Sequence, residues 1–117
     1  MSNKKPVKIY WSSNHLPLPI QLKWLERRFG TIQVVMGKTG NAAEIVEDFK
    51  RQDCDEMVVV APLWVIYHIL KEGVKPLWAD MEVIDDPAEA DLEYRGRFYK
   101  FRGFKRIVAV EIKYEEV

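Results

Sequence analysis

Four polar side chains stand together near the amino end of the chain: Ser12, Ser13, Asn14 and His15. An imidazole exchanges protons near neutral pH, so His15 is a candidate general acid or base. A serine hydroxyl at Ser12 or Ser13 can orient a phosphoryl oxygen or a ribose hydroxyl. The pattern predicts a site for a nucleotide or another phosphate-bearing ligand, with His15 and Ser12 as candidate catalytic residues.

A helix-capping turn explains the same residues equally well. The helix-like run Ile20 to Phe29 follows the four polar residues. Free backbone amides and the dipole at the start of a helix favour an anion, and polar side chains before a helix also satisfy those amides. The sequence leaves both interpretations open.

The segment Gly37-Lys38-Thr39 matches the end of the phosphate-binding P-loop motif but lacks the glycine spacing of that motif. That motif needs a glycine five residues before its Gly-Lys pair, and Ile32 occupies this position. We therefore interpret the segment as a turn. The exposed cation of Lys38 remains a candidate ligand contact.

The remaining single candidates are weak. His68 lies in an apolar helix-like run, which favours a partly buried, hydrogen-bonded histidine, and Cys54 lies between two aspartates that should raise the pKa of its thiol. Asp80 and Glu82 alternate onto one face of a predicted strand, where an acidic edge facing water explains them better than Mg²⁺ ligation. The sequence implies no metal and no cofactor.

A basic and aromatic segment near the carboxyl end suggests a different class of partner. Aromatic residues interleave there with Arg95, Arg97, Lys100 and Arg102, a composition that binds single-stranded nucleic acid when it covers one exposed sheet face. Strand alternation instead mixes both residue types on both faces. The segment from Asp80 to Glu93 is acidic without a base, so mutual neutralisation of neighbouring strands and loops is the favoured interpretation.

Hydrophobic patterns and turn residues predict the elements that position these candidates. Pro19 suits the first turn of the first helix, Gly30 its end, and Asn41 the start of the second helix. The predicted strands are Val7–Trp11, Thr31–Met36, Asp55–Ala61 and Pro76–Ile84, and the predicted helices are Ile20–Phe29, Asn41–Gln52 and Leu63–Lys71. An acidic loop, Asp85–Leu92, precedes a predicted antiparallel hairpin of Tyr94–Phe101 and Phe104–Tyr114 that turns at Arg102-Gly103.

The order βαβαβαβ predicts an α/β fold, a three-layer Rossmann-like sandwich whose mostly parallel sheet carries the hairpin at one edge. The strand order stays open between 3-2-1-4 and 2-1-3-4. In both orders the first strand borders the topological switch point, so the turn from Ser12 to His15 should line the ligand crevice.

Composition sets the wider frame. The 117 residues suit one domain, residues 1–117, and 18 basic residues balance 18 acidic ones, so no global field recruits nucleic acid or a membrane. A single cysteine, no apolar amino-terminal run and no long apolar stretch predict a cytoplasmic protein without disulfides or a membrane span.

The short first strand, the Ser-Ser-Asn-His turn and the Pro-led helix with Gln21 and Gly30 resemble small CRISPR-associated proteins with a Rossmann-like fold. The resemblance covers mainly Val7 to Gly30. It implies binding of a cyclic oligoadenylate and metal-independent ring-nuclease cleavage at a homodimer interface, with Ser12, Ser13, Asn14 and His15 at the ligand and Lys38 as a phosphate contact. The competing class is a non-catalytic module that dimerises through its aromatic-rich edge, or that binds RNA.

Overall fold

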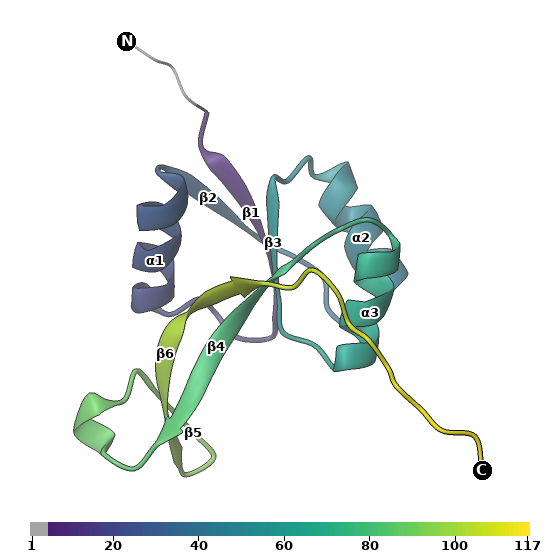
Figure 1. Cartoon of the computed structure of the whole chain (residues 1–117). Coiled ribbons are helices and arrows are strands. Elements are labelled where there is room, and N and C mark those ends of the chain that lie inside the picture. Colours follow the sequence, from purple (N-terminus) through teal and green to yellow (C-terminus); the bar gives the residue numbers. More distant parts are fainter. Residues whose placement is uncertain (1–4) are drawn as a thin grey trace.

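Parallel strands form the centre of the fold. In the computed structural model, which describes residues 5–117, β1 (Val7–Ser12) pairs in parallel with β2 (Ile32–Met36) and with β3 (Glu56–Val59). The next strand, β4 (Leu77–Ile84), pairs in parallel with β3. The whole sheet has the order β2-β1-β3-β4-β6-β5 (Figure 1), so its first four strands follow the 2-1-3-4 order.

Three helices cover the two faces of the sheet. One face carries α1 (Pro19–Phe29), and the other carries α2 (Ala42–Arg51) and α3 (Leu63–Lys71) (Figure 1). The predicted helix ends are confirmed: the side chain of Asn41 accepts hydrogen bonds from two amides of α2, and the amide of Gly30 donates to the carbonyl of Glu26 at the end of α1. No helix within residues 5–117 is long and apolar enough to cross a membrane.

Two clusters of buried side chains hold the helices to the sheet. Alternation along β1 sends Ile9 and Trp11 to the α1 face and Tyr10 to the α2 and α3 face. The strand β3 divides in the same way, because Val58 joins the first cluster while Met57 and Val59 join the second. Both central strands are therefore apolar on both faces, as expected for strands covered by helices on each side.

The sheet is mixed rather than mostly parallel. The strand β6 (Arg97–Arg106) runs antiparallel to β4, and β5 (Leu92–Tyr94) runs antiparallel to β6 at the edge. A two-residue turn joins β5 to β6, and its residues Arg95 and Gly96 have φ of 51° and 77°, the positive values of a type I′ hairpin turn. The acidic loop before β5 contains the short 3₁₀ helix η1 (Pro87–Glu89).

The predicted hairpin is wrong in its turn and in the length of its second strand. Arg102 and Gly103 lie inside β6 at an irregularity of its pairing with β4, and Gly103 has a φ of 112°. A Cβ atom on Gly103 would lie 3.1 Å from Nε1 of Trp24, so glycine lets α1 approach β6 closely. The strand ends at Arg106 because the chain then turns onto the α2 and α3 face, where Ile107 and Val110 pack.

The antiparallel part of the sheet projects beyond the parallel part. Leu77, the first residue of β4, pairs with Val58 near the end of β3, so most of β4 extends past the carboxyl ends of β1 and β3. It pairs there with β6, and β5 completes the projection (Figure 1). We call the projecting parts of these three strands the ribbon.

Candidate ligand-binding pocket

A pocket of about 470 Å³ opens where the carboxyl ends of β1 and β3 meet the ribbon. Its walls are mainly apolar and aromatic: Trp11, Val60, Trp78, Met81, Leu92 and Tyr94 contribute to them. From β1 the chain crosses to α1 on one face, and from β3 it crosses to α3 on the other. The pocket therefore lies at the topological switch point of the sheet, where open α/β sheets bind ligands.

Exposed apolar side chains gather around this pocket. Leu16 is 75% exposed, Val60 53%, Trp78 41% and Tyr94 40%, and all four line the pocket. Scattered exposed apolar residues are normal on a protein surface, but a contiguous patch beside a concavity is typical of a binding site. The distribution points to a ligand or partner with an apolar surface.

Polar groups converge on the apolar pocket from the β1–α1 loop and from α1. Ser13, His15 and Gln21 are among its lining residues. Gln21 is 6% exposed, and its Oε1 accepts a hydrogen bond from the amide of Leu18 at 2.9 Å. Among residues 5–117, its Nε2 has only a long contact of 3.9 Å with Sδ of Met81. A sulfur is a weak acceptor, so the side-chain amide of Gln21 keeps donor capacity for a ligand.

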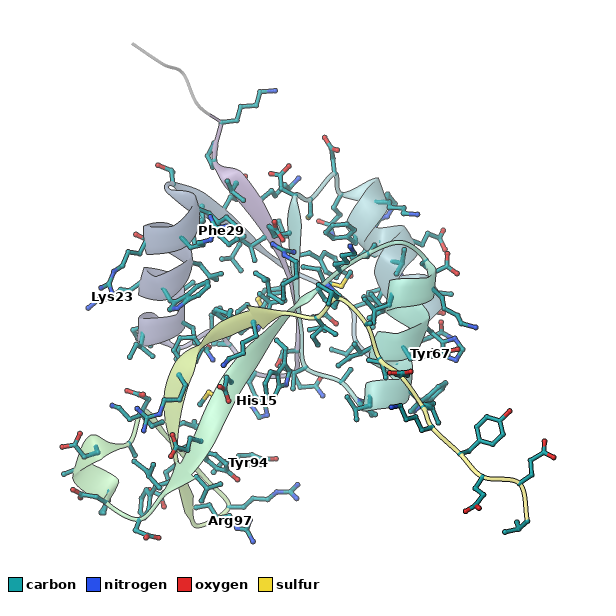
Figure 2. The ribbon with its side chains drawn as sticks, viewed as in Figure 1. His15, Lys23, Phe29, Tyr67, Tyr94 and Arg97 are labelled. Carbon is teal, nitrogen blue, oxygen red and sulfur yellow. The ribbon has the colours of Figure 1, made fainter. Side chains whose placement is uncertain are left out.

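The loop between β1 and α1 holds His15 at the mouth of the pocket. The indole Nε1 of Trp11 donates to the carbonyl oxygen of His15 at 2.7 Å, and the amide of His15 donates to Oγ of Ser13 at 3.1 Å. The imidazole stands edge-on to the ring of Tyr94, with centroids 5.4 Å apart and planes at 80° (Figure 2). This contact joins the loop to the ribbon across the pocket.

The other three expected ligand contacts, Ser12, Asn14 and Lys38, lie in hydrogen bonds between the end of β1 and the loop after β2. Ser12 is 1% exposed and its Oγ donates to the carbonyl oxygen of Lys38 at 2.7 Å. Oδ1 of Asn14 accepts from Oγ1 of Thr39 at 3.4 Å. Neither residue lines the pocket, and the exposed Lys38 does not line it either. The structure thus brings Ser13 and His15 to the pocket and uses Ser12, Asn14 and Lys38 to join two loops.

The amides at the start of α1 contribute little to anion binding. The helix begins at Pro19, which has no amide hydrogen, and the amides of Gln21 and Leu22 both donate to the carbonyl of Leu18. Three residues separate His15 from the helix. The apolar segment Leu16-Pro17-Leu18 therefore stands between the four polar residues and the helix, and α1 has no side-chain cap from them among the described residues.

A buried polar pair, Tyr10 and Asp48, is hydrogen-bonded to the backbone of the β2–α2 loop. Oη of Tyr10 donates to Oδ2 of Asp48 at 2.7 Å and accepts from the amide of Lys38 at 2.8 Å. Burial, and then the hydrogen bond to Asp48, raise the pKa of Tyr10 to about 12. Hydrogen bonds lower the pKa of Asp48, most strongly the one from Tyr10, then the one from Arg51 and then the one from Gln52. Burial of the Asp48 carboxylate acts in the opposite direction.

The basic and aromatic segment is partly neutralised by neighbouring acids, as the charge pattern predicted. Arg102 forms an ion pair with Glu82 at 2.6 Å, and Lys105 forms one with Asp80 at 3.2 Å. Nζ of Lys100 lies 4.0 Å from Asp91 and donates to the carbonyl of Glu89. Arg95 stacks on the ring of Tyr94, and Arg97 is exposed beside the turn (Figure 2). Two of the four bases, Lys100 and Arg102, are therefore paired with acids, whereas Arg95 and Arg97 form no ion pair with a carboxylate that the structure describes.

The remaining candidates lie away from the pocket. His68 is exposed on α3 against the rings of Trp64 and Tyr67, so the expectation of a partly buried histidine is wrong. Burial is the main cause that raises the pKa of the Cys54 thiol. Neighbouring carboxylates raise it further, and the positive charge of Lys8 lowers it. Within residues 5–117, no three His, Cys, Asp or Glu side chains gather as metal ligands.

Sequence reasoning missed most of the pocket wall. Trp78, Met81, Leu92 and Tyr94 come from the ribbon, far along the chain from His15. Their high aromatic content was the only available signal, and it also fits a nucleic-acid surface.

Comparison with known proteins gives no match to the chain among family models, curated proteins or solved structures.

Proposed function

We propose that the chain binds a nucleotide, with the base in the switch-point pocket and the phosphate at its mouth beside His15. The observation that carries the proposal is the set of aromatic walls around an open pocket at the carboxyl edge of the sheet. The parallel part of the sheet, with its 2-1-3-4 order and helices on both faces, supports a Rossmann-like use of this edge.

The aromatic walls suit a planar base. Trp11, Trp78, Tyr94 and Tyr99 line the pocket, and each base presents a π-face that stacks on such rings. Gln21 and Ser13 line the same space, and their side chains can donate hydrogen bonds to the edge of a base or to a ribose hydroxyl. A few polar groups in an otherwise apolar pocket fix the orientation of a ligand.

The phosphate position follows from the charges around the mouth. His15 is exposed there, and Cζ of Arg95 lies over the Tyr94 ring, 5.2 Å from its centroid. Neither residue forms an ion pair with a carboxylate in the described part of the chain. These two groups are therefore available to an anion in a way that Lys100 and Arg102 are not.

The specific form of the proposal is a cyclic oligoadenylate ligand, as in the CRISPR-associated proteins that the amino-terminal region resembles. Cleavage by such a protein needs no metal: the 2′-hydroxyl of the ligand attacks the adjacent phosphorus, and the bond to the 5′-oxygen breaks. The 2′-hydroxyl loses its proton to water, and the leaving 5′-oxygen takes a proton from His15. The products are a 2′,3′-cyclic phosphate and a 5′-hydroxyl.

Binding rests on more of the structure than cleavage does. Ser12 is committed to Lys38, and the amides of Gln21 and Leu22 are committed to Leu18, so the proposal assigns proton transfer to His15. One general acid supplies roughly 10²- to 10⁴-fold of rate. We therefore propose nucleotide binding as the primary function and cleavage as its testable extension, with a non-catalytic binding module as the competing class.

The test of binding is a calorimetric titration of the full chain with AMP, linear oligoadenylates, cyclic oligoadenylates and single-stranded RNA. We expect binding of an adenylate, weakened about 5- to 150-fold in Tyr94→Ala, which corresponds to the roughly 1–3 kcal/mol of one stacked base. Tyr67→Ala, an aromatic truncation on α3, is the matched control and should leave the affinity unchanged. Absence of adenylate binding at low salt would refute the proposal.

The test of cleavage follows the same ligands over time with and without a chelator. Turnover that persists in chelator and disappears in His15→Ala supports the ring-nuclease form. Intact ligand in the presence of tight binding refutes that form and leaves a binding module without catalysis.

A further inference from the structure

The carboxyl-terminal residues carry a strand pattern without a strand partner. From Val108 to Glu115, apolar side chains alternate with mostly charged ones: Val108, Val110, Ile112 and Tyr114 fall on one side, and Ala109, Glu111, Lys113 and Glu115 on the other. No residue after Arg106 belongs to a helix or strand. We call residues 107–117 the arm.

The arm leaves its apolar side chains in water. Ile112 is 69% exposed and Tyr114 is 82% exposed, although both have high preference for strands. Only the first part of the arm packs on the protein, through Ile107 and Val110 against the α2 and α3 cluster. An extended, alternating and exposed segment of this kind gains stability by adding to the edge of a sheet.

Strand β6 has an open edge on the side of the molecule away from the arm. Strand β6 runs from Arg97 to Arg106, but β5 covers only its residues 97–99 and Asp91 accepts a hydrogen bond from the amide of Phe101, so residues 102–106 are open on that side within residues 5–117. Beside this open edge lies a groove of about 820 Å³ between α1 and β6. The groove therefore offers room for one more extended segment.

The charges of the groove and of the arm are complementary. Lys23 and Arg27 of α1 line the groove, both exposed and without an ion pair to any carboxylate that the structure describes. Asp91, the one acid among the described residues that line the groove, already accepts a hydrogen bond from the amide of Phe101 at 2.9 Å. The arm carries Glu111, Glu115 and Glu116 against a single base, Lys113.

The arm points away from the groove of its own chain. It crosses the α2 and α3 face and extends beyond α3, whereas α1 and the ribbon lie on the other side of the molecule (Figure 1). Lys23 and Tyr67 mark these opposite sides (Figure 2). We propose that the arm of a second copy occupies the groove between α1 and β6, pairing with the open edge of β6 and with Lys23 and Arg27.

Reciprocal exchange of the two arms gives a closed dimer with twofold symmetry. The apolar side chains of each arm then cover the apolar groove residues, among them Ile20 and Trp24. This interface shares Leu18 with the lining of the switch-point pocket but is built from other strand edges and charges, so it goes beyond the proposed nucleotide binding and stands without it.

The test is the oligomeric state of the full chain by sedimentation over a concentration series. We expect a dimer that Lys23→Glu/Arg27→Glu weakens about tenfold or more, that Glu111→Lys/Glu115→Lys weakens similarly, and that the four changes together restore. Lys50→Glu/Lys71→Glu on α2 and α3 is the matched control and should leave the dimer intact. Restoration excludes misfolding as the cause of the weakening.

Cysteine cross-linking in a Cys54→Ser background identifies what fills the groove. Chains with Ile112→Cys mixed with chains with Lys23→Cys should form a disulfide-linked pair under mild oxidation. A monomer at every concentration overturns the proposal. The proposal is also overturned if Ile112→Cys cross-links to Gln33→Cys, on the edge strand β2, and not to Lys23→Cys. Binding of single-stranded RNA in the groove of a monomer overturns it as well.

Discussion

The imidazole of His15 stands edge-on to the ring of Tyr94 across the mouth of the pocket, with centroids 5.4 Å apart. His15 comes from the loop after the first strand, and Tyr94 ends the short edge strand β5. The contact therefore joins the switch point of the parallel sheet to the antiparallel ribbon. Both rings are exposed, so a ligand that enters the pocket meets both.

Removal of the Ser12 hydroxyl should affect stability and leave ligand binding nearly unchanged. In Ser12→Ala the carbonyl of Lys38 loses the hydrogen bond that it accepts at 2.7 Å, so we expect a loss of about 1 kcal/mol in the free energy of unfolding. Chemical denaturation and calorimetric titration measure the two quantities. An abolished turnover with wild-type stability would restore a catalytic role for Ser12.

The turn after β2 requires glycine at position 37. A Cβ atom at Gly37 would lie 2.3 Å from Cζ of the buried Tyr10 ring, closer than any real contact. We expect Gly37→Ala to lower the free energy of unfolding by roughly 1–3 kcal/mol, as overpacking does. Thr39→Ala in the same exposed loop is the control and should change it by less than about 0.5 kcal/mol. Equal stability of the two variants in urea denaturation would contradict this packing.

The carboxylate of Asp48 should make stability depend on acid pH. Its pKa is lowered in the folded state, chiefly by the hydrogen bond from Tyr10, so ionised Asp48 stabilises the fold at all pH values above the unfolded pKa of about 4. That contribution is lost as the pH falls through the lower folded-state pKa. We expect the difference in stability between wild type and Asp48→Asn to shrink on acidification below about pH 4. A constant difference across this range would show that Asp48 is not held ionised.

The phenol of Tyr10 should have the opposite pH dependence. Its pKa is raised to about 12 by burial and by Asp48, so the neutral phenol stabilises the fold below the unfolded pKa of about 10. This stabilisation is lost as the pH rises from about 10 through about 12. An ultraviolet titration of wild type minus Tyr10→Phe should show one tyrosine that ionises near pH 12. Ionisation of this tyrosine near pH 10 would contradict the buried pair.

Local patterns predicted the parallel half of the fold well, because helix caps and alternating or continuous apolar runs are local signals. Asn41 caps the start of α2 and Gly30 the end of α1, as predicted, and His15 and Ser13 lie at the switch point. The antiparallel half depends on long-range contacts. Arg95-Gly96 and Arg102-Gly103 are identical dipeptides, yet the first forms the turn between β5 and β6 while the second lies within β6 at an irregularity of its pairing with β4.

The pocket itself could not be predicted because strand pairing builds it. The register of β4 with β3 carries Trp78 and Met81 beyond the parallel strands and places them opposite the β1–α1 loop. Nothing near Trp78 in the sequence indicates that position. The hydrogen bond from Ser12 to Lys38 is hidden in the same way, since the two residues are 26 positions apart in the chain.

The four tryptophans provide the most direct test of nucleotide binding in the switch-point pocket. Trp11 and Trp78 line that pocket, Trp24 lines the groove beside α1, and Trp64 is exposed on α3. Their indole N–H signals in a ¹⁵N-correlated NMR spectrum, assigned with Trp→Phe variants, report each place separately during titration with a cyclic oligoadenylate. The proposal predicts that the Trp11 and Trp78 signals shift while those of Trp24 and Trp64 stay in place. Shifts confined to Trp24 or Trp64, or no shift at saturating ligand, would contradict it.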